Sequence, residues 1–287
     1  MKKKSLLKIF FWRFILLLAI IFILWQRYPI FFKDSFNSIV SSINVNQSSN
    51  STVKWKKLNY GIETCTLSWK NNEATFATNV FMLRFDPDLI QTRVLYQHGL
   101  TAVKKIAESE GAFAAINASF FDPNGRPLGL LVQNSRVTQK MPQLGMLSSG
   151  IFCLKYKRPQ IFHRDKISMP GVTEAIQSFP RLIHNGRCIQ QFKNKHEAKR
   201  RSGIAIDYKG NIIIYATDTH FSGLSLSDLQ DLLLKPELNI RSALNLDGGR
   251  SSQLYLNYKN YTKHIIGLSD VPVFLGFFEK LEYGDEK

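Results

Sequence analysis

The chain contains few cysteines and no cysteine motif. Only three of its 287 residues are Cys, at positions Cys65, Cys153 and Cys188. They lie far apart and form no Cys-x-x-Cys pair, so they suggest neither a zinc site nor a disulfide framework. We therefore expect buried free thiols. One disulfide among the three, formed in an oxidising compartment, is the alternative.

Several functional signatures are also missing. The sequence shows no helix-turn-helix, zinc-finger or aromatic RNA-binding signature, which argues against a nucleic-acid partner. Ser251 and Ser252 lie outside any Gly-x-Ser-x-Gly elbow, which disfavours a serine hydrolase. With 44% hydrophobic and 12% aromatic residues, the composition is that of an ordinary globular protein.

Acidic residues are absent before Asp34, where the chain instead has a basic start and an apolar run. The run covers residues 9–25 and is interrupted only by Arg13. Its length is at the short end of a membrane span, and the positive charge before it keeps the N-terminus cytoplasmic. A cleaved signal peptide is the alternative, but no small-x-small cleavage site follows the run, and no lipobox cysteine is present there. Residues 1–33 are predicted to form a cytoplasmic start and a transmembrane signal anchor helix, with the rest of the chain periplasmic or extracellular.

Composition divides the remainder into a linker and one domain. Residues 34–53 are rich in Ser and Asn and predict a flexible linker, whereas residues 54–287 contain no further linker or repeat and predict a single domain. The formal net charge is +16, and without the seven basic residues ahead of Asp34 the 31 basic and 22 acidic residues leave +9. Such an excess favours anionic partners, such as a phosphorylated glycan or a membrane surface.

Strand-like segments outnumber helical ones, and hairpin signals are frequent. The Asn185-Gly186 pair predicts one hairpin turn, and the Lys209-Gly210 pair predicts another. The expected strands cover residues 76–85, 89–96, 113–116, 128–132, 150–156, 182–183, 188–189, 204–207, 212–216, 243–246, 253–256 and 272–278.

Two helices are expected among these strands. Residues 101–110 have Thr101 as the predicted N-cap, and residues 225–234 begin with a capping-box pattern of Ser225 and Asp228. The sequence therefore predicts an α+β fold, a single domain with a largely antiparallel mixed sheet and a few short helices, preceded by the membrane anchor helix.

The most informative stretch is residues 245–252, which read NLDGGRSS. The carboxylate of Asp247 is followed by two glycines, a cation and two hydroxyls, between two strand-like segments. Paired glycines allow positive φ and bring backbone N–H groups close to a ligand, so an anionic or sugar-like ligand is the natural candidate. A plain Asp-Gly hairpin turn is the alternative.

Three other segments concentrate polar residues where strands are expected to end, at residues 117–129, 177–186 and 200–223. Each also has a purely structural interpretation. Asn117 could serve only to tie a loop together, and Arg201 belongs to a basic cluster that suits a solvated surface. Asp218 and His220 could form a metal pair, but two ligands do not make a site.

Taken together, the four segments resemble the phosphodiester glycosidase domain family, which includes a lysosomal uncovering enzyme and many bacterial exported proteins. The resemblance covers residues 112–278, and the shorter bacterial branch is the most similar. Ala118, Ser119, the pair Asn134-Ser135 and Arg250 depart from the family pattern. The matching stretches are INASFFDPNGRPLGLLV, QSFPRLIHNG, RSGIAIDYKGNIIIYATD and ALNLDGGRSSQLYL.

The resemblance implies a hydrolase that cleaves the bond between a sugar's anomeric carbon and a phosphodiester in envelope or extracellular glycans, without a cofactor. Phosphate is a good leaving group, so the reaction needs charge neutralisation and a base or nucleophile. Asp247 is the expected base or nucleophile, Asp218 its partner, and Arg201 the group that neutralises phosphate. The expected substrate-binding residues are Asn117, Gln177, Arg181, Asn245, Gly248, Gly249, Ser251 and Ser252.

The expected substrate is a phosphorylated glycan or a nucleotide-sugar-like molecule. Two alternatives from other classes stay open at this point. One is a non-catalytic module that binds phosphorylated polysaccharide. The other is a metal-dependent phosphodiesterase with Asp218, His220 and Asp247 as ligands of a divalent ion.

Overall fold

A computed structural model describes residues 52–70, 77–142, 149–192, 197–219 and 222–280. All of them belong to one compact unit, Val45–Lys287. The predicted anchor and nearly all of the predicted linker lie outside the described residues, so their boundaries remain predictions. Within the described part, no helix is long and apolar enough to span a bilayer.

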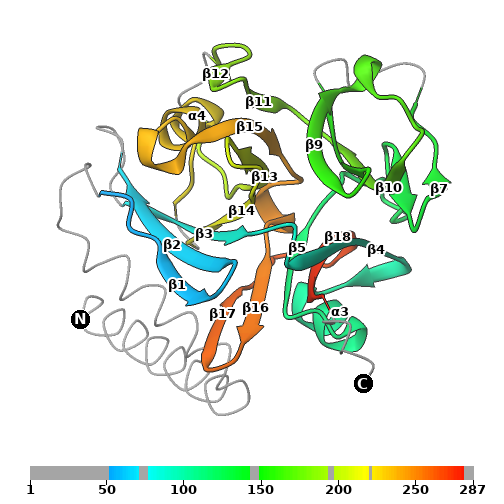
Figure 1. Ribbon diagram of the computed structural model, residues 1–287, viewed down its shortest axis with the longest axis horizontal. Coiled ribbons are helices and arrows are strands. Elements are labelled where there is room, and N and C mark those ends of the chain that lie inside the picture. Colours follow the sequence, from blue (N-terminus) through cyan, green and yellow to red (C-terminus); the bar gives the residue numbers. More distant parts are fainter. Residues whose placement is uncertain (1–51, 71–76, 143–148, 193–196, 220–221, 281–287) are drawn as a thin grey trace, which may run out of the picture. The chain divides into compact units, whose positions relative to one another are not determined.

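The described strands form three sheets rather than the one sheet expected (Figure 1). Every strand pair among them is antiparallel, so the prediction of a largely antiparallel sheet is confirmed. The parallel pairs that a mixed sheet requires are not found among the described strands. Two short helices cannot cover so many strands laid out as one open sheet. The strands instead form separate sheets that cover one another.

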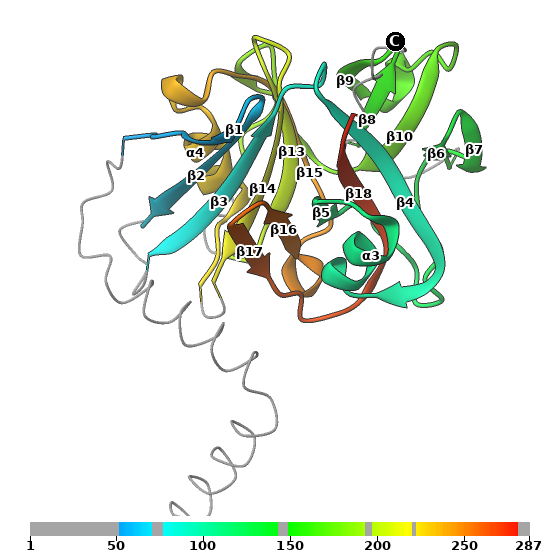
Figure 2. The same ribbon diagram turned by 60° about the horizontal axis from the view of Figure 1, so that its bottom comes forward.

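The large sheet has eight strands in the order β1-β2-β3-β14-β13-β15-β11-β12. Figure 2 shows its strands fanning out beside the two smaller sheets. Its strands are β1 (Lys56–Asn59), β2 (Ile62–Trp69), β3 (Thr78–Phe85), β11 (Arg181–His184), β12 (Arg187–Cys188), β13 (Ser202–Asp207), β14 (Ile212–Asp218) and β15 (Ile240–Asn245).

Two five-stranded sheets complete the described unit, in the orders β7-β6-β10-β8-β9 and β17-β16-β5-β18-β4. The first contains β6 (Leu131–Gln133), β7 (Arg136–Gln139), β8 (Gly150–Lys155), β9 (Arg158–His163) and β10 (Val172–Ser178). The second contains β4 (Ile90–Thr101), β5 (Ala114–Asn117), β16 (Leu254–Tyr258), β17 (Tyr261–Ile265) and β18 (Val271–Glu279). The helical segments are α3 (Val103–Glu110), α4 (Leu226–Leu233) and the 3-10 turns η1 (Arg164–Lys166), η2 (Pro236–Leu238) and η3 (Gly249–Ser251).

Strand β14 shows how the large sheet is buried on both faces. Its alternate residues Ile212, Ile214 and Ala216 pack in the central core against the smaller sheets, whereas Ile213 and Tyr215 pack with α4 on the other face. Successive side chains of a strand point to opposite faces, so a continuous apolar run is what a doubly covered strand requires.

The helix predictions succeed at α4 and fail at the start of α3. The predicted capping box is present, with Ser225 as N-cap and Asp228 at N3. Thr101, by contrast, is the last residue of β4 and pairs with Val271, so Ala102 is the N-cap of α3. The Val103 N–H donates to the Gln253 side chain at 2.7 Å, a tertiary contact that replaces the local cap.

Glu174 links two sheets through the main chain. From β10 its carboxylate accepts the N–H of Val94 on β4 at 2.8 Å and the N–H of Asn134 at 3.0 Å. The Gln133 side chain donates to the carbonyl of Val94 at 3.1 Å. Burial raises the pKa of Glu174. This cross-sheet bridge is a buried polar cluster in which both carboxylate oxygens have a partner.

All three cysteines are free thiols, and Cys65 and Cys153 are buried as expected, whereas Cys188 is only half-buried. Burial raises the pKa of the Cys65 thiol to about 11 and that of Cys153 to about 12. A thiol with so high a pKa is a weak nucleophile, so Cys65 and Cys153 have a packing role.

Candidate active site

Residues 245–252 connect two different sheets. They leave β15 of the large sheet and enter β16 of the sheet that contains β5 and β18. The connection is therefore a crossover, and the alternative of a plain hairpin turn is excluded. Gly249, the first residue of η3, has a φ of 60°, the left-handed conformation that favours glycine.

Main-chain hydrogen bonds bring the four polar segments to this crossover. The N–H of Asp247 donates to the Ala118 carbonyl at 3.0 Å, and that of Gly249 donates to the Arg200 carbonyl at 2.8 Å. The N–H of Asn245 donates to the Pro180 carbonyl at 3.0 Å. We call the place where residues 117–119, 177–181, 200–202 and 245–252 meet the strand-end site.

The backbone of Asp247 is fixed from two sides. Its carbonyl accepts the Asn117 amide at 2.6 Å and the Ser202 hydroxyl at 2.8 Å. The Asn117 side-chain oxygen in turn accepts the N–H of Gln253 at 3.0 Å, so both polar atoms of this buried amide hold the crossover. Asn117 is thus a positioning residue for Asp247.

The Asp247 carboxylate lies in a partly buried position that raises its pKa to about 6, chiefly by desolvation. Hydrogen bonds from the Ser251 hydroxyl and the Gly248 N–H oppose this shift, because they stabilise the charged form. A carboxyl group with a pKa near 6 suits both general base and general acid chemistry at neutral pH.

Buried polar atoms without a partner gather at the strand-end site. Within the described residues, ten buried side-chain nitrogen or oxygen atoms have no hydrogen-bond partner, and seven of them belong to this site. Buried polar atoms are nearly always hydrogen-bonded, so such a concentration indicates groups that are arranged for a ligand. The seven are Ser119 Oγ, Ser178 Oγ, Arg181 Nε, Arg200 Nε, Arg200 Nη1, Asn245 Oδ1 and Ser252 Oγ.

Arg200 and Arg201 are both buried but differ in what their guanidinium groups contact. Arg200 donates through Nη2 alone, to the carbonyls of Ser252 at 2.9 Å and Ile266 at 2.7 Å, which leaves Nε and Nη1 without a partner. Arg201 donates through Nε to Leu224 and through Nη2 to Glu197. Both residues lie just ahead of β13, and their side chains leave the chain in different directions.

The pKa values of both arginines are lowered by burial, and the negative charge of Asp218 counteracts this effect at Arg200. Asp218 ends β14 and forms an ion pair with Lys263 on β17 at 2.5 Å. Among the described residues, no hydrogen bond joins it to Asp247, and its ion-pair partner is Lys263. His220 lies outside the described residues, and no three His, Cys, Asp or Glu side chains group together within them.

Gln177 and Arg181 come from the strand ends on the other side of the site. The Gln177 side chain is fully buried, accepts the Leu130 N–H at 2.8 Å and donates to Ser149 at 2.9 Å. Arg181 is half-buried, and burial lowers its pKa. A Cβ at Gly150 would lie 2.3 Å from Arg181 Cγ, so a glycine is required there for this arginine to fit.

Two aromatic residues that the sequence did not single out lie beside these polar groups. The rings of Phe120 and Phe179 stack with a centroid separation of 4.4 Å and an interplanar angle of 26°. Both are half-buried, and Asn245 donates to the Phe179 carbonyl at 2.9 Å. Apolar rings beside a few convergent polar groups are typical of small-molecule sites.

Family comparison agrees with this geometry. A family model for phosphodiester glycosidases matches residues 110–278, more than half of the chain. The chain belongs to this family. The match contains all four segments of the strand-end site and confirms the resemblance seen in the motifs. No similar sequence was found among curated proteins.

Solved structures show the same fold at low sequence identity. The catalytic domain of zebrafish N-acetylglucosamine-1-phosphodiester alpha-N-acetylglucosaminidase, auto-inhibited by its pro-peptide, has a TM-score of 0.61 at 15% identity, covering 80% of this chain and 89% of that one. A hypothetical protein from Synechocystis has a TM-score of 0.57 at 18% identity, covering 82% of this chain. This chain spans 65% of the Synechocystis protein.

Proposed function

We propose that the strand-end site hydrolyses the bond between the anomeric carbon of a sugar and the phosphate of a phosphodiester. The observation that supports this most directly is the Asp247 carboxylate, with its raised pKa, in a site that also holds the unpartnered nitrogens of Arg200. A carboxylate for the sugar and a cation for the phosphate are the two groups that this reaction needs.

In this proposal Asp247 acts as base or nucleophile at the anomeric carbon. Its carboxylate is ionised above pH 6, and the Ser251 hydroxyl and Gly248 N–H orient it. Ser202 and Asn117 hold its backbone without contacting substrate. The sugar ring would lie on the Phe120–Phe179 pair, with Asn245 Oδ1 and Ser252 Oγ available for its hydroxyls.

Arg200 takes the phosphate in this proposal. The sequence suggested Arg201, but Nε and Nη2 of that side chain bind backbone carbonyls. Nε and Nη1 of Arg200 have no partner, and each can donate a hydrogen bond to a phosphate oxygen. Asp218 then acts as the neighbouring charge that favours protonated Arg200, and Arg181 Nε is a second donor.

The substrate class we propose is a phosphorylated glycan or nucleotide-sugar-like diester in the envelope or the extracellular space. The N-terminal apolar run supports membrane attachment, with the domain on the outer side of the membrane.

Product analysis tests this function. The purified chain is incubated with UDP-N-acetylglucosamine and with an envelope glycan extract, and the products are followed by phosphorus NMR. A free reducing sugar together with a phosphomonoester supports the proposal. Release of sugar-1-phosphate would instead indicate cleavage of the P–O bond, and binding without turnover would indicate a non-catalytic module.

A further inference from the structure

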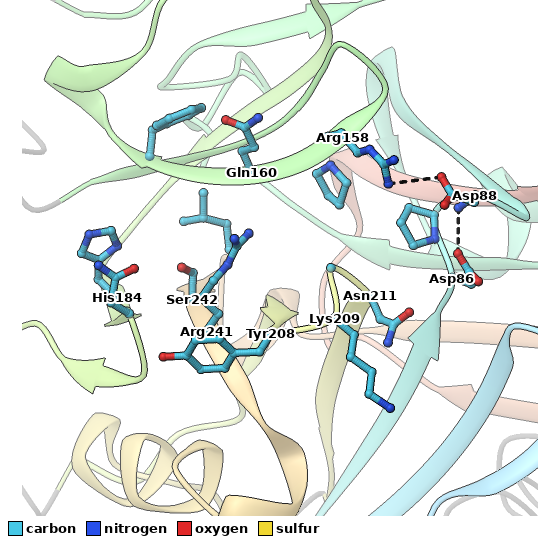
Figure 3. Close-up of a pocket in the computed structure, with 16 residues that line it drawn as sticks. Asp86, Asp88, Arg158, Gln160, His184, Tyr208, Lys209, Asn211, Arg241 and Ser242 are labelled. Carbon is cyan, nitrogen blue, oxygen red and sulfur yellow. Dashed lines mark hydrogen bonds and ion pairs between the residues drawn. The ribbon is translucent and has the colours of Figure 1, made fainter.

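A polar cavity lies at the start of β15, the end of this strand opposite the strand-end site. Its volume is about 830 Å³, and it is lined by residues 86–88, 158–162, 184–185, 208–211 and 241–242. β15 begins there and ends at the strand-end site, so roughly 13 Å of strand separate Arg241 from Asn245. We call this cavity the far-end cleft (Figure 3).

The far-end cleft carries cations with no charge partner. Within the described part of the chain, Arg241 and Lys209 make no side-chain hydrogen bond or ion pair, whereas Arg158 contacts Asp88 at 3.5 Å. His184 lies near Arg241 at one end of the cleft, and Asp86 and Asp88 lie at the other end (Figure 3). Arg158 and Lys209 lie closer to these carboxylates than to His184, so the carboxylates are confined to one end of the cleft whereas the cations are not (Figure 3).

Tyr208 offers an aromatic surface beside Arg241 (Figure 3). It leaves 56% of its surface exposed, so its ring is accessible to a ligand. The turn of the β11–β12 hairpin holds it in place, since a Cβ at Gly186 would lie 2.7 Å from the Tyr208 hydroxyl. Gln160 and Ser242 add neutral hydrogen-bonding groups to the lining.

We infer that the far-end cleft is a second glycan site, which binds a phosphate-bearing polysaccharide away from the strand-end site. Phosphate groups bind at Arg241 and Lys209, a sugar ring packs on Tyr208, and the Asp86 and Asp88 carboxylates accept polyol hydroxyls. The size of the cleft suits several sugar units.

The test measures binding of glucosylated poly(glycerol phosphate) to the full chain. In this polymer the glucose is attached to a glycerol carbon and not to phosphate, so it is not a substrate of the proposed hydrolysis, and binding is scored independently of activity. Arg241→Ala and Lys209→Ala are each expected to weaken binding about tenfold, the usual effect of losing one charge-assisted hydrogen bond. Tyr208→Phe should bind like the wild type, whereas Tyr208→Ala should bind more weakly.

Lys105→Ala is the matched control, because it removes an equal charge from an exposed position on α3 outside the cleft. It should bind like the wild type, and neutral dextran should not compete. The inference is overturned if Arg241→Ala and Lys209→Ala bind normally, or if Lys105→Ala loses as much affinity as they do. The proposed hydrolysis could still stand in either case.

Discussion

The molecule contains two buried polar clusters that differ in how well their atoms are satisfied. In the cross-sheet bridge, both oxygens of Glu174 accept a backbone N–H, from Val94 and Asn134. In the strand-end site, seven buried polar atoms have no partner among the described residues. A cluster that satisfies itself stabilises the fold, whereas one that leaves donors and acceptors open costs stability until a ligand binds.

This contrast predicts that substitutions in the two clusters affect different quantities. Changes in the bridge should lower the free energy of unfolding and leave turnover per folded molecule intact. Changes to the Asp247 carboxylate and to the unpartnered groups of the strand-end site should lower turnover and leave stability nearly unchanged, or even raise it.

Asp247→Asn should have the largest effect on activity. It removes the proposed base or nucleophile while keeping the shape of the side chain, so kcat should fall about a thousandfold or more. Burial raises the pKa of Asp247 to about 6, so its ionisation disfavours the folded state as the pH rises through that value. The variant should therefore unfold at the same temperature as the wild type or a higher one at pH 7, measured by thermal denaturation. Wild-type turnover by this variant would contradict the role of Asp247.

Arg200→Gln and Arg201→Gln separate the two adjacent arginines. Losing the unpartnered donors of Arg200 should reduce kcat/KM about a hundredfold, comparable to removing one donor that stabilises transition-state charge. Arg201→Gln should retain most of its activity when folded, but lose about 2 kcal/mol of stability, because the carbonyls of Leu224 and Glu197 each lose a hydrogen bond from a buried cation. Steady-state kinetics measures kcat/KM of both variants, and urea unfolding measures their stability. The opposite result, with activity depending on Arg201, would restore the assignment made from sequence.

The sequence was sufficient wherever local chemistry decides the structure. The Asn185-Gly186 hairpin and the Ser225–Asp228 capping box depend on neighbouring residues only, and both are present. The four motif segments also converge as their order in the family suggested. The start of α3 could not be predicted, because its acceptor, Gln253, lies 150 positions away from Val103.

Which of Arg200 and Arg201 binds the phosphate likewise could not be predicted from sequence. It depends on the tertiary contacts of two adjacent side chains just ahead of β13, and a run of basic residues does not reveal which of them binds backbone carbonyls. The stack of Phe120 on Phe179 joins two segments that no sequence pattern links. Site chemistry is therefore visible in sequence as residue types, whereas its geometry depends on tertiary contacts.

Glu174→Gln tests the cross-sheet bridge. One acceptor becomes an NH2 group that faces a backbone N–H, so the free energy of unfolding should fall by about 1–3 kcal/mol. The pKa of Glu174 is raised in the folded state, so its contribution to stability is fully present below the pKa of an unfolded glutamate and is lost as the pH rises through the folded value. The gap between wild type and variant should be widest in acid and narrow towards neutral pH, as urea unfolding at several pH values would show. A loss of turnover without a loss of stability would break the contrast between the clusters.

Ser251→Ala should produce the smallest effect, a shift in pH dependence. A base that must be ionised gives a rate that rises with pH, so kcat/KM should increase through an apparent pKa near 6 in the wild type. The Ser251 hydroxyl stabilises the charged carboxylate. Removing it should therefore shift the rising limb of the pH–rate profile to higher pH by about one unit or less. Ser269→Ala is a matched control, since its hydroxyl contacts Arg250 outside the carboxylate's surroundings and its limb should not move. If the Ser251→Ala limb stays in place or moves to lower pH, then Asp247 is not the group whose ionisation controls the rate.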